Sequence, residues 1–200
     1  MDNLMVPAGV KGILQRLQTA GHPAYLVGGC VRDTLLGRTP EDWDICTAAL
    51  PEQTMALFDR TVPTGLKHGT VTVFYGGSQA EVTTFRKDGP YTDHRRPDEV
   101  QFTDRLTEDL SRRDFTVNAM AMDLEGNLID PFGGQKDLKE NCLRCVGDPD
   151  KRFQEDALRM FRAFRFAAQL NMGIDTATHD AICRNTHLAR FVAPERIHTE

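Results

Sequence analysis

A chain of 200 residues with 40% hydrophobic content can bury a sizeable core, as one domain or as one domain with a small second one. It has no stretch near the roughly 18 apolar residues of a membrane span, and its first residues lack the order of a secretory signal, so we expect a cytoplasmic protein with no membrane partner. The five scattered cysteines argue against a disulfide framework, and the net charge of −5 argues against a uniformly basic surface for binding nucleic acid.

The first third of the sequence is predicted to alternate helices with short strands. Apolar residues recur with helical spacing until Gly21, which is typical of a glycine stop. A short apolar run then leads directly into Gly28-Gly29, as a buried strand does when it turns into a helix. The expected order is a helix at 10–20, a strand at 24–27, a helix at 31–36, a strand at 43–45 and a helix at 51–58.

The middle of the chain is predicted to contain a hairpin, a loop and a long helix. The β-branched and aromatic runs at 71–75 and 81–85 flank Gly76-Gly77-Ser78, which is a hairpin signal. The polar residues 86–98 are expected to form a mobile loop. Residues 106–122 are expected to form a helix, and a turn and a strand should follow it.

The composition shifts near residues 140–150 from a mixed α/β part to an all-α part. Five basic residues against two acidic ones between Lys151 and Leu170 predict a helix that can face polyphosphate. Cys142 and Cys145 form a C-x-x-C without a second ligand pair at zinc spacing, so we interpret them as packing residues. The chain ends at Glu200 within an uncapped helical pattern, so we expect a longer natural protein.

The aspartates Asp42 and Asp44 carry the first chemical signal. On the predicted strand they point to one face, while Trp43 and Ile45 point into the core. Two neighbouring carboxylates repel each other unless a divalent cation neutralises them, and oxygen ligands suit Mg²⁺ that is also bound by substrate phosphates. The alternative is a solvated strand end, which is the commoner meaning of an isolated pair of this kind.

Two further features stand close to this pair in the expected fold. Gly28-Gly29 joins a strand to a helix, where backbone N–H groups can approach a phosphate, although a tight turn alone would also need glycine. Glu81 shares a strand face with Thr83. It either brings a third carboxylate to the aspartates or lies on the surface of an edge strand.

A set of short segments follows in one order along almost the whole chain. The segments are LVGGCVRD at 26–33, DWDI at 42–45, EVTTFR at 81–86, RRDFTVNA at 112–119, DPFGG at 130–134, EDALR at 155–159 and PERI at 194–197. This set resembles the signature of the class II tRNA nucleotidyltransferases, which are CCA-adding enzymes, and of the related bacterial poly(A) polymerases.

The resemblance implies an α+β fold with a polymerase-β-like head over residues 1–145. The start of an all-α neck would follow at 146–200, with the C-terminal body and tail absent. In this family a pair of aspartates binds two metal ions, here expected to be Mg²⁺, and a third acid supports them. The metal ligands and catalytic residues are therefore expected to be Asp42 and Asp44, with Glu81 as the third catalytic acid.

The resemblance also implies a set of nucleotide-binding residues. A charged helix without such a role is the alternative for the segment at 112–122, and a surface ion pair at i, i+3 is the alternative for Asp156 and Arg159. In the family the latter pair contacts the edge of the incoming base, so that protein replaces a template. Three phenylalanines nearby, Phe161, Phe164 and Phe166, are expected in the core. The expected nucleotide-binding residues are Gly28, Gly29, Arg32, Arg113, Asp114, Asn118, Asp156, Arg159 and Arg162.

The activity implied by the resemblance is the addition of CMP and AMP from CTP and ATP to the 3′ end of tRNA or another RNA. The family's loop residues are all present, whereas CC-only members tend to have lost part of this loop, so we favour CCA addition, A addition or poly(A) synthesis. A non-catalytic nucleotide-binding or RNA-binding module is disfavoured because both aspartates are retained. The loop residues are Arg86, Asp88, Tyr91, Asp93, Arg95, Arg96 and Pro97.

Overall fold

The computed structural model describes residues 6–89, 91 and 99–200. The chain divides into two compact units. The first contains Met1–Lys87, Val100–Leu110 and Met120–Pro131, and the second contains Asp88–Glu99, Ser111–Ala119 and Phe132–Glu200. The chain therefore passes between the units more than once before it stays in the second.

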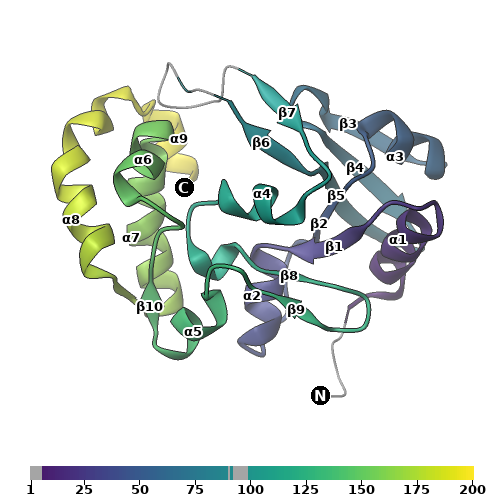
Figure 1. The fold of residues 1–200 in the computed structure, drawn as a ribbon, viewed down its shortest axis with the longest axis horizontal. Coiled ribbons are helices and arrows are strands. Elements are labelled where there is room, and N and C mark those ends of the chain that lie inside the picture. The colour runs from purple at the N-terminus through teal and green to yellow at the C-terminus, as the bar shows by residue number, and fades with distance from the viewer. Residues whose placement is uncertain (1–5, 90, 92–98) are drawn as a thin grey trace. The chain divides into compact units, whose positions relative to one another are not determined.

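A seven-stranded mixed sheet forms the centre of the first unit (Figure 1). Its order is β3-β4-β5-β2-β1-β8-β9. Strand β2 pairs in parallel with β5 and antiparallel with β1, so segments far apart in the sequence lie side by side. The strands are β1 (Ala24–Val27), β2 (Asp44–Thr47), β3 (Thr61–Gly65), β4 (Thr70–Tyr75), β5 (Ser78–Thr84), β8 (Ala121–Met122) and β9 (Leu128–Ile129).

Helices bury the apolar side chains of this sheet. Helices α1 (Ala8–Thr19) and α3 (Pro51–Leu57) contact each other and the strands β4 and β5, while α2 (Gly29–Leu35) contacts β1. Ile13, Leu14 and Leu17 of α1 are buried, as their helical spacing predicts. The other elements of this part of the chain are a 3-10 turn (Leu66–His68), α4 (Leu106–Ser111), and the paired strands β6 (Arg86–Asp88) and β7 (Val100–Phe102).

The hairpin of β4 and β5 follows from its turn residues. Gly76 and Gly77 alone connect Tyr75 to its pairing partner Ser78, and their φ angles are 55° and 77°. A two-residue turn with positive φ at both positions matches the twist of the flanking strands and favours glycine. This turn sets the register between β4 and β5.

The second unit consists mainly of helices. Helix α6 packs against α8, and α7 contacts both α6 and α9. Asp148 and Asp175 cap α6 and α8 by accepting hydrogen bonds from backbone N–H groups of the first turn. The elements are α5 (Gly134–Lys139), α6 (Pro149–Glu155), α7 (Leu158–Leu170), α8 (Thr176–Asn185), α9 (Pro194–Thr199), 3-10 turns at Thr116–Asn118 and Thr186–Phe191, and the parallel strands β10 (Cys142–Leu143) and β11 (Gly173–Ile174).

The structure confirms the α+β fold with its mixed sheet. The predicted helices and strands before residue 86 are present, with shifts of a few residues at their ends. No helix among the described residues is long and apolar enough to cross a membrane. The cytoplasmic location stays a prediction. The domain boundary between residues 145 and 146 also stays a prediction. The compact units are interleaved along the chain and are not two consecutive segments.

Several predictions for the rest of the chain were wrong. Residues 106–122 do not form one helix, because the backbone of Phe115 is extended and bridges to Cys145. Burial and pairing of this segment outweigh its helical pattern. Residues 86–88 form β6, whereas residues 90 and 92–98 of the predicted loop lie outside the described residues. The part predicted to be all-α also contains β11, which pairs with β10.

Candidate functional site

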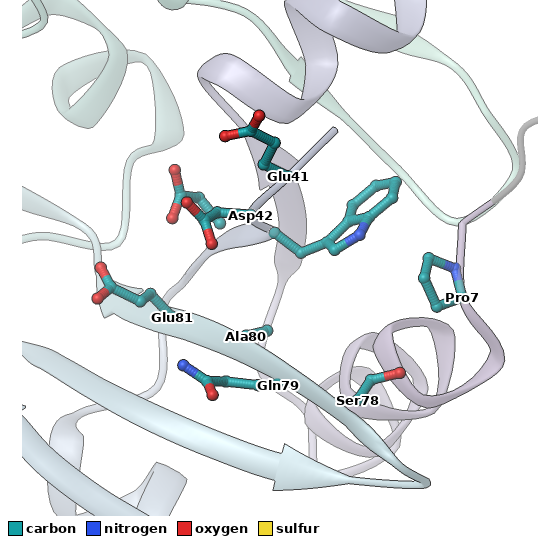
Figure 2. Close-up of a pocket in the computed structure, with 9 residues that line it drawn as sticks. Pro7, Glu41, Asp42, Ser78, Gln79, Ala80 and Glu81 are labelled. Atoms are coloured by element: carbon teal, nitrogen blue, oxygen red, sulfur yellow. The ribbon is translucent and has the colours of Figure 1, made fainter. Parts of the chain in front are cut away.

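A cavity of about 540 Å³ in the first unit brings the predicted catalytic acids together. In the parallel pairing of β2 with β5, Asp44 lies directly opposite Glu81. Figure 2 shows the side chains of Asp42 and Glu81 reaching toward the same side of this cavity. The lining residues are Pro7, Glu41, Asp42, Trp43, Asp44, Ser78, Gln79, Ala80 and Glu81.

The route by which Asp42 reaches the cavity differs from the prediction. Strand β2 begins at Asp44, so Asp42 lies in the bend before the strand, and strand alternation does not place it there. Ile45 is fully buried as expected, but Trp43 is half-buried and lines the cavity instead of joining the core. The two aspartates still border one cavity.

Glu81 lies in the interior of the sheet. Strand β5 has β4 on one side and β2 on the other, so the alternative of an edge-strand residue was wrong. The backbone N–H of Glu81 donates to the carbonyl oxygen of Trp43 at 3.1 Å, which fixes the strand beside Asp44. Its side chain is exposed to the cavity side. A carboxylate exposed on a central strand is more consistent with a site than with sheet packing.

Two lining residues were missed by the sequence analysis. Glu41 adds a fourth carboxylate to the cavity wall, and its place directly before Asp42 was the available signal. Gln79 lies two residues before Glu81 on the same strand, so strand alternation places both side chains on one face. The cavity therefore offers four carboxylates and one amide, all of which supply oxygen donors.

The donor set fits a hard divalent cation that has additional ligands from elsewhere. Among the described residues, no group of three or more His, Cys, Asp or Glu side chains is placed to hold one ion together. Mg²⁺ usually takes only one or two protein carboxylates and completes its octahedron with water and substrate phosphate oxygens. The pair Asp42 and Asp44 fits that mode of binding and does not form a closed protein cage.

The turn at Gly28-Gly29 has the geometry of a sharp strand-to-helix connection. Gly28 has φ 78° and ψ −131°, a conformation that favours glycine, and its N–H donates to the carbonyl oxygen of Met120 at 3.2 Å. Arg32 of α2 is buried and makes two hydrogen bonds of 2.9 Å with the carboxylate of Asp33. Because the Gly28 N–H is engaged, a phosphate at this turn would be bound by other groups.

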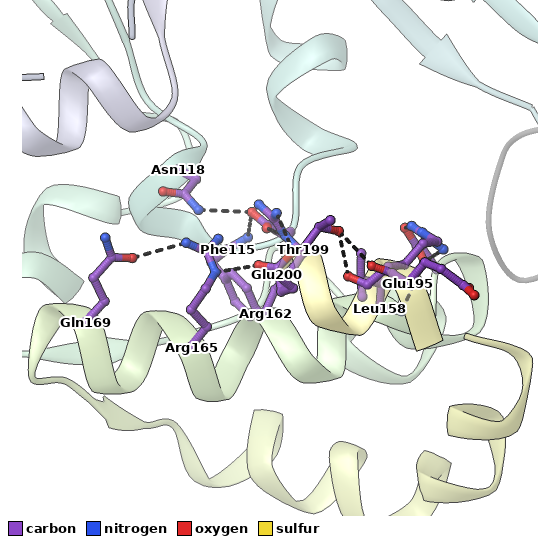
Figure 3. Close-up of polar contacts among 12 residues, drawn as sticks. Phe115, Asn118, Leu158, Arg162, Arg165, Gln169, Glu195, Thr199 and Glu200 are labelled. Atoms are coloured by element: carbon purple, nitrogen blue, oxygen red, sulfur yellow. Dashed lines mark hydrogen bonds and ion pairs between the residues drawn. The ribbon is translucent and has the colours of Figure 1, made fainter. Parts of the chain in front are cut away.

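In the second unit, three predicted nucleotide-binding residues meet at Asp114. The Nε of Arg162 donates to Asp114 Oδ2 at 2.8 Å, and Asp114 Oδ1 accepts from the Asn118 amide at 3.2 Å and from the Phe115 N–H at 2.8 Å. Figure 3 shows these contacts and the neighbouring ion pairs of Arg162 and Arg165 with Glu200. Asp114 and Asn118 were predicted to lie one turn apart on a helix, and this was wrong. They are joined by an extended segment and a 3-10 turn.

The electrostatics of this cluster favour an ionised Asp114. Burial alone would raise the pKa of the carboxyl group, but the Arg162 guanidinium and the hydrogen bonds from Phe115 and Asn118 outweigh it and hold the pKa below its ordinary value. Arg113, which directly precedes Asp114 in the sequence, is half-buried. Asp114 thus belongs to a largely buried, charge-compensated cluster within the second unit.

The alternative for Asp156 and Arg159, a surface ion pair at i, i+3, was wrong, because each side chain has another partner. Asp156 has an extended backbone between α6 and α7, and its carboxylate bonds to Arg196 at 3.0 and 3.3 Å. Arg159 is buried and donates to Glu155 at 2.5 Å and to the carbonyl oxygen of Arg112 at 2.9 Å. Burial lowers the pKa of Arg159, but the neighbouring Tyr91 and Glu155 raise it by more than burial lowers it. The guanidinium therefore stays charged.

The remaining predictions have mixed outcomes. Phe166 is buried and packs edge to face on Phe115, Phe161 is half-buried, and Phe164 is 53% exposed, so its place in the core was wrong. Among the loop residues, Tyr91 donates to Asp88 at 2.6 Å. Arg86 lies in β6 and its guanidinium donates to the carbonyl oxygen of His68. The other loop residues, Asp93, Arg95, Arg96 and Pro97, lie outside the described residues.

The two cysteines of the C-x-x-C have the properties of packing residues. Cys145 is buried, and burial raises the pKa of its thiol to about 12. Burial also raises the pKa of the half-buried Cys142. A thiol with a raised pKa is a poor metal ligand and nucleophile, because the thiolate is the reactive form.

Comparison with known proteins gives consistent matches over this same chain. A family model described as the poly(A) polymerase head domain matches residues 24–144. The chain is 53% identical over 188 residues to the CCA-adding enzyme of Lactobacillus helveticus, which covers 94% of this chain and 47% of that protein. It is 54% identical to the CCA-adding enzyme of Anoxybacillus flavithermus, with the same coverage. The chain thus spans about half the length of the curated relatives it matches.

Solved structures show the same fold. The crystal structure of the Bacillus stearothermophilus CCA-adding enzyme in complex with CTP is similar with a TM-score of 0.90 and 48% identity, over 96% of this chain and 47% of that one. The Thermotoga maritima CCA-adding enzyme complexed with tRNA is similar with a TM-score of 0.77 and 28% identity, over 94% of this chain and 44% of that one.

Proposed function

The chain belongs to the family of the poly(A) polymerase head domain, and on this premise we propose that its gene product adds CMP and AMP from CTP and ATP to the 3′ end of tRNA. The observation that carries the proposal is the convergence of Asp42, Asp44 and Glu81 on one cavity. Curated CCA-adding enzymes at 53% and 54% identity support the choice of reaction.

The chemistry is an in-line displacement at phosphorus. The oxygen of the RNA 3′-hydroxyl group forms a bond to the α-phosphorus of the nucleotide, and the bond to the β-phosphate oxygen breaks, so that pyrophosphate leaves. Two Mg²⁺ ions, when bound, would lower the pKa of the hydroxyl group and neutralise charge on the phosphates. Asp42 and Asp44 would hold them, and Glu81 would add a third acid opposite Asp44.

Each unit carries its own proposed nucleotide contacts. At the turn into α2, Gly29 and Arg32 are proposed to bind the triphosphate, with Arg32 oriented by Asp33. Gly28, whose N–H donates to Met120, is proposed to supply the backbone conformation of this turn. In the second unit, the ionised Asp114 accepts hydrogen bonds and is proposed to contact the ribose together with Asn118. Arg113 and Arg162 are the proposed phosphate contacts there.

Nucleotide choice is proposed to depend on Asp156 and Arg159. Cytosine N4 and adenine N6 are amino groups that donate hydrogen bonds, whereas guanine O6 and the corresponding oxygen of uracil only accept. A carboxylate that accepts beside a guanidinium that donates therefore favours C and A over G and U. Both side chains are held in place by protein contacts of their own.

Incubation of the full-length gene product with tRNA that lacks its terminal CCA and with each labelled triphosphate tests the proposal. We expect C, C and A to be added in that order and extension to stop. The family model's own description favours poly(A) polymerase as the second candidate. Long A tracts on unrelated RNA would support it, addition of A alone would indicate an A-adding enzyme, and no incorporation at all would indicate a non-catalytic module.

A further inference from the structure

Part of the wall of the acidic cavity carries no charge. Figure 2 shows Asp42 and Glu81 at one end of the cavity and Pro7 and Ser78 at the other. The volume of about 540 Å³ lies within the range of roughly 300–1,000 Å³ that is typical of small-molecule sites, and metal ions alone need less. We call this region the uncharged part of the cavity. Its lining residues are Pro7, Trp43, Ser78, Gln79 and Ala80.

The strand register brings a neutral polar side chain next to the third acid. Strand β2 begins at Asp44, which pairs with Glu81, whereas β5 already begins at Ser78. Gln79 lies two residues before Glu81, is exposed like Glu81, and points to the same face of β5. The Gln79 amide is therefore a hydrogen-bonding group without charge beside the proposed catalytic acids.

Trp43 adds an aromatic ring to the uncharged part. Its side chain is half-buried and lines the cavity. Its carbonyl oxygen accepts the hydrogen bond from the Glu81 N–H at 3.1 Å, so the backbone that carries the indole is fixed beside β5. An aromatic ring that is only partly covered at a cavity wall offers a surface on which a planar group can stack.

The absence of charge favours the acceptor RNA over the triphosphate as the occupant. Phosphate groups are repelled by the carboxylates unless metal ions are bound, so the triphosphate needs the acidic part of the cavity. Among the described residues that line the cavity, none is a side chain proposed above for the triphosphate or the base, namely Arg32, Asp156 or Arg159. The RNA must bring its 3′-hydroxyl group to the acids, so its last nucleotide has to lie next to them.

We propose that the uncharged part of the cavity binds the terminal nucleotide of the acceptor RNA, an inference that rests on the proposed function. The base stacks on the Trp43 indole, and Gln79 and Ser78 donate hydrogen bonds to oxygens of the sugar or phosphate. Stacking on an aromatic ring tolerates every base. This tolerance suits an enzyme whose acceptor can end in a different nucleotide after each addition.

The first test compares Trp43→Leu and Trp43→Phe in the full-length gene product, with an RNA hairpin that lacks a terminal CCA. We expect Trp43→Leu to raise the KM for the RNA by about tenfold, as expected for the loss of one base–aromatic stack, and to leave the KM for CTP unchanged. Trp43→Phe keeps an aromatic face and should stay close to wild type. Tyr75→Leu is the matched control, because it removes a 38% exposed ring of β4 outside the cavity.

An RNA with an abasic terminal nucleotide shows whether Trp43 acts through the base. The abasic RNA should raise the KM of the wild-type protein by a similar factor, and Trp43→Leu should lose little more with it. Additive effects of the two changes, or a wild-type KM for the RNA in Trp43→Leu, would overturn the inference. If Trp43 only packs against its neighbours, Trp43→Leu lowers the melting temperature and leaves the KM for the RNA unchanged.

Gln79→Ala gives an independent test, because the side chain is exposed and its loss should not affect folding. We expect the KM for the RNA to rise about fivefold, as for the loss of one hydrogen bond, and the KM for CTP to stay the same. If Trp43→Leu does not fold, Gln79→Ala and the abasic RNA decide, and normal KM values in both experiments would overturn the inference. A wild-type protein that transfers no nucleotide to any RNA refutes the proposed function instead, so the two failures are distinguishable.

Discussion

The acidic cavity of the first unit and the Asp114 cluster of the second differ in how they compensate charge. The cavity is lined by four carboxylates, and no Lys, Arg or His is among the described residues that line it. In the cluster, Asp114 is paired with Arg162, and the nearby Asp156 and Arg159 have Arg196 and Glu155 as partners. The side chains that line the cavity therefore carry charge of one sign, whereas the cluster in the second unit contains both signs.

Because of this difference, substitutions in the two regions should have different effects on activity and on stability. Removal of a carboxylate from the cavity relieves repulsion and should affect chemistry without affecting stability. Removal of one partner from a buried pair leaves an uncompensated charge and should affect stability. The predictions that follow test this separation.

The largest effect is expected in the cavity. Asp42→Ala and Asp44→Ala should each lower nucleotide incorporation by about 10³-fold or more, because each removes a carboxylate that we propose as a ligand of the metal ions. Single-turnover assays measure the rate, and thermal melts should show an intact fold. Glu125→Ala, which removes an exposed carboxylate elsewhere in the first unit, is the control. Normal activity in either aspartate variant would rule out the metal assignment.

The next effect is expected in the Asp114 cluster. Asp114→Ala should lower the free energy of unfolding by about 3 kcal/mol, because the Arg162 guanidinium loses its nearest carboxylate inside a largely buried cluster. Urea denaturation measures the change. Lys136→Ala, which breaks an exposed pair with Glu140, should cost only a few tenths of a kcal/mol. A loss as small as that of the control would show that the cluster is not charge-coupled.

A smaller effect is expected on nucleotide choice. Asp156→Ala and Arg159→Ala should each lower selectivity for C and A over G and U by about tenfold, because each removes one of the hydrogen bonds that we propose to the base edge. Competition between labelled triphosphates gives the ratio directly. Unchanged selectivity in both variants would remove the idea that protein side chains replace a template.

The smallest effect is a pH dependence confined to acid. The pKa of Asp114 is lower in the folded protein than its ordinary value, so its ionisation stabilises the fold above that ordinary value. This stability is lost as the pH falls through the lowered pKa. Wild-type protein should therefore lose more stability than Asp114→Asn between pH 7 and about pH 3, a range that spans the ordinary Asp pKa. Parallel pH profiles of the two proteins would contradict the assignment.

Local signals predicted the first unit well. The Gly76-Gly77 turn and the glycine stop at Gly21 are determined by residues close in sequence, and both are present. The aspartates of the DWDI segment were also recognisable, although the bend before β2 moved Trp43 to the cavity wall. Glu81 was identified as a candidate acid, but its central strand position depends on pairing with β2. Strand order is a long-range property that periodicity does not contain.

The second unit was predicted less well for a physical reason. The segment at 112–122 has a helical pattern, yet Phe115 extends to bridge Cys145 because both are buried there. The partner of Asp156 lies 40 residues away, so no local spacing could identify it. The position of Phe164 shows the same limit, because helical spacing places it on α7 but cannot tell which face is covered.

The parallel pairing of β2 with β5 has a consequence for the order in which the molecule matures. Asp44 is synthesised before Glu81, and β3, β4 and the glycine turn lie between them in the chain. The acidic cavity is therefore complete only after β5 has paired with β2. Fragments that end before β5 therefore lack Glu81 and the pairing that places it opposite Asp44.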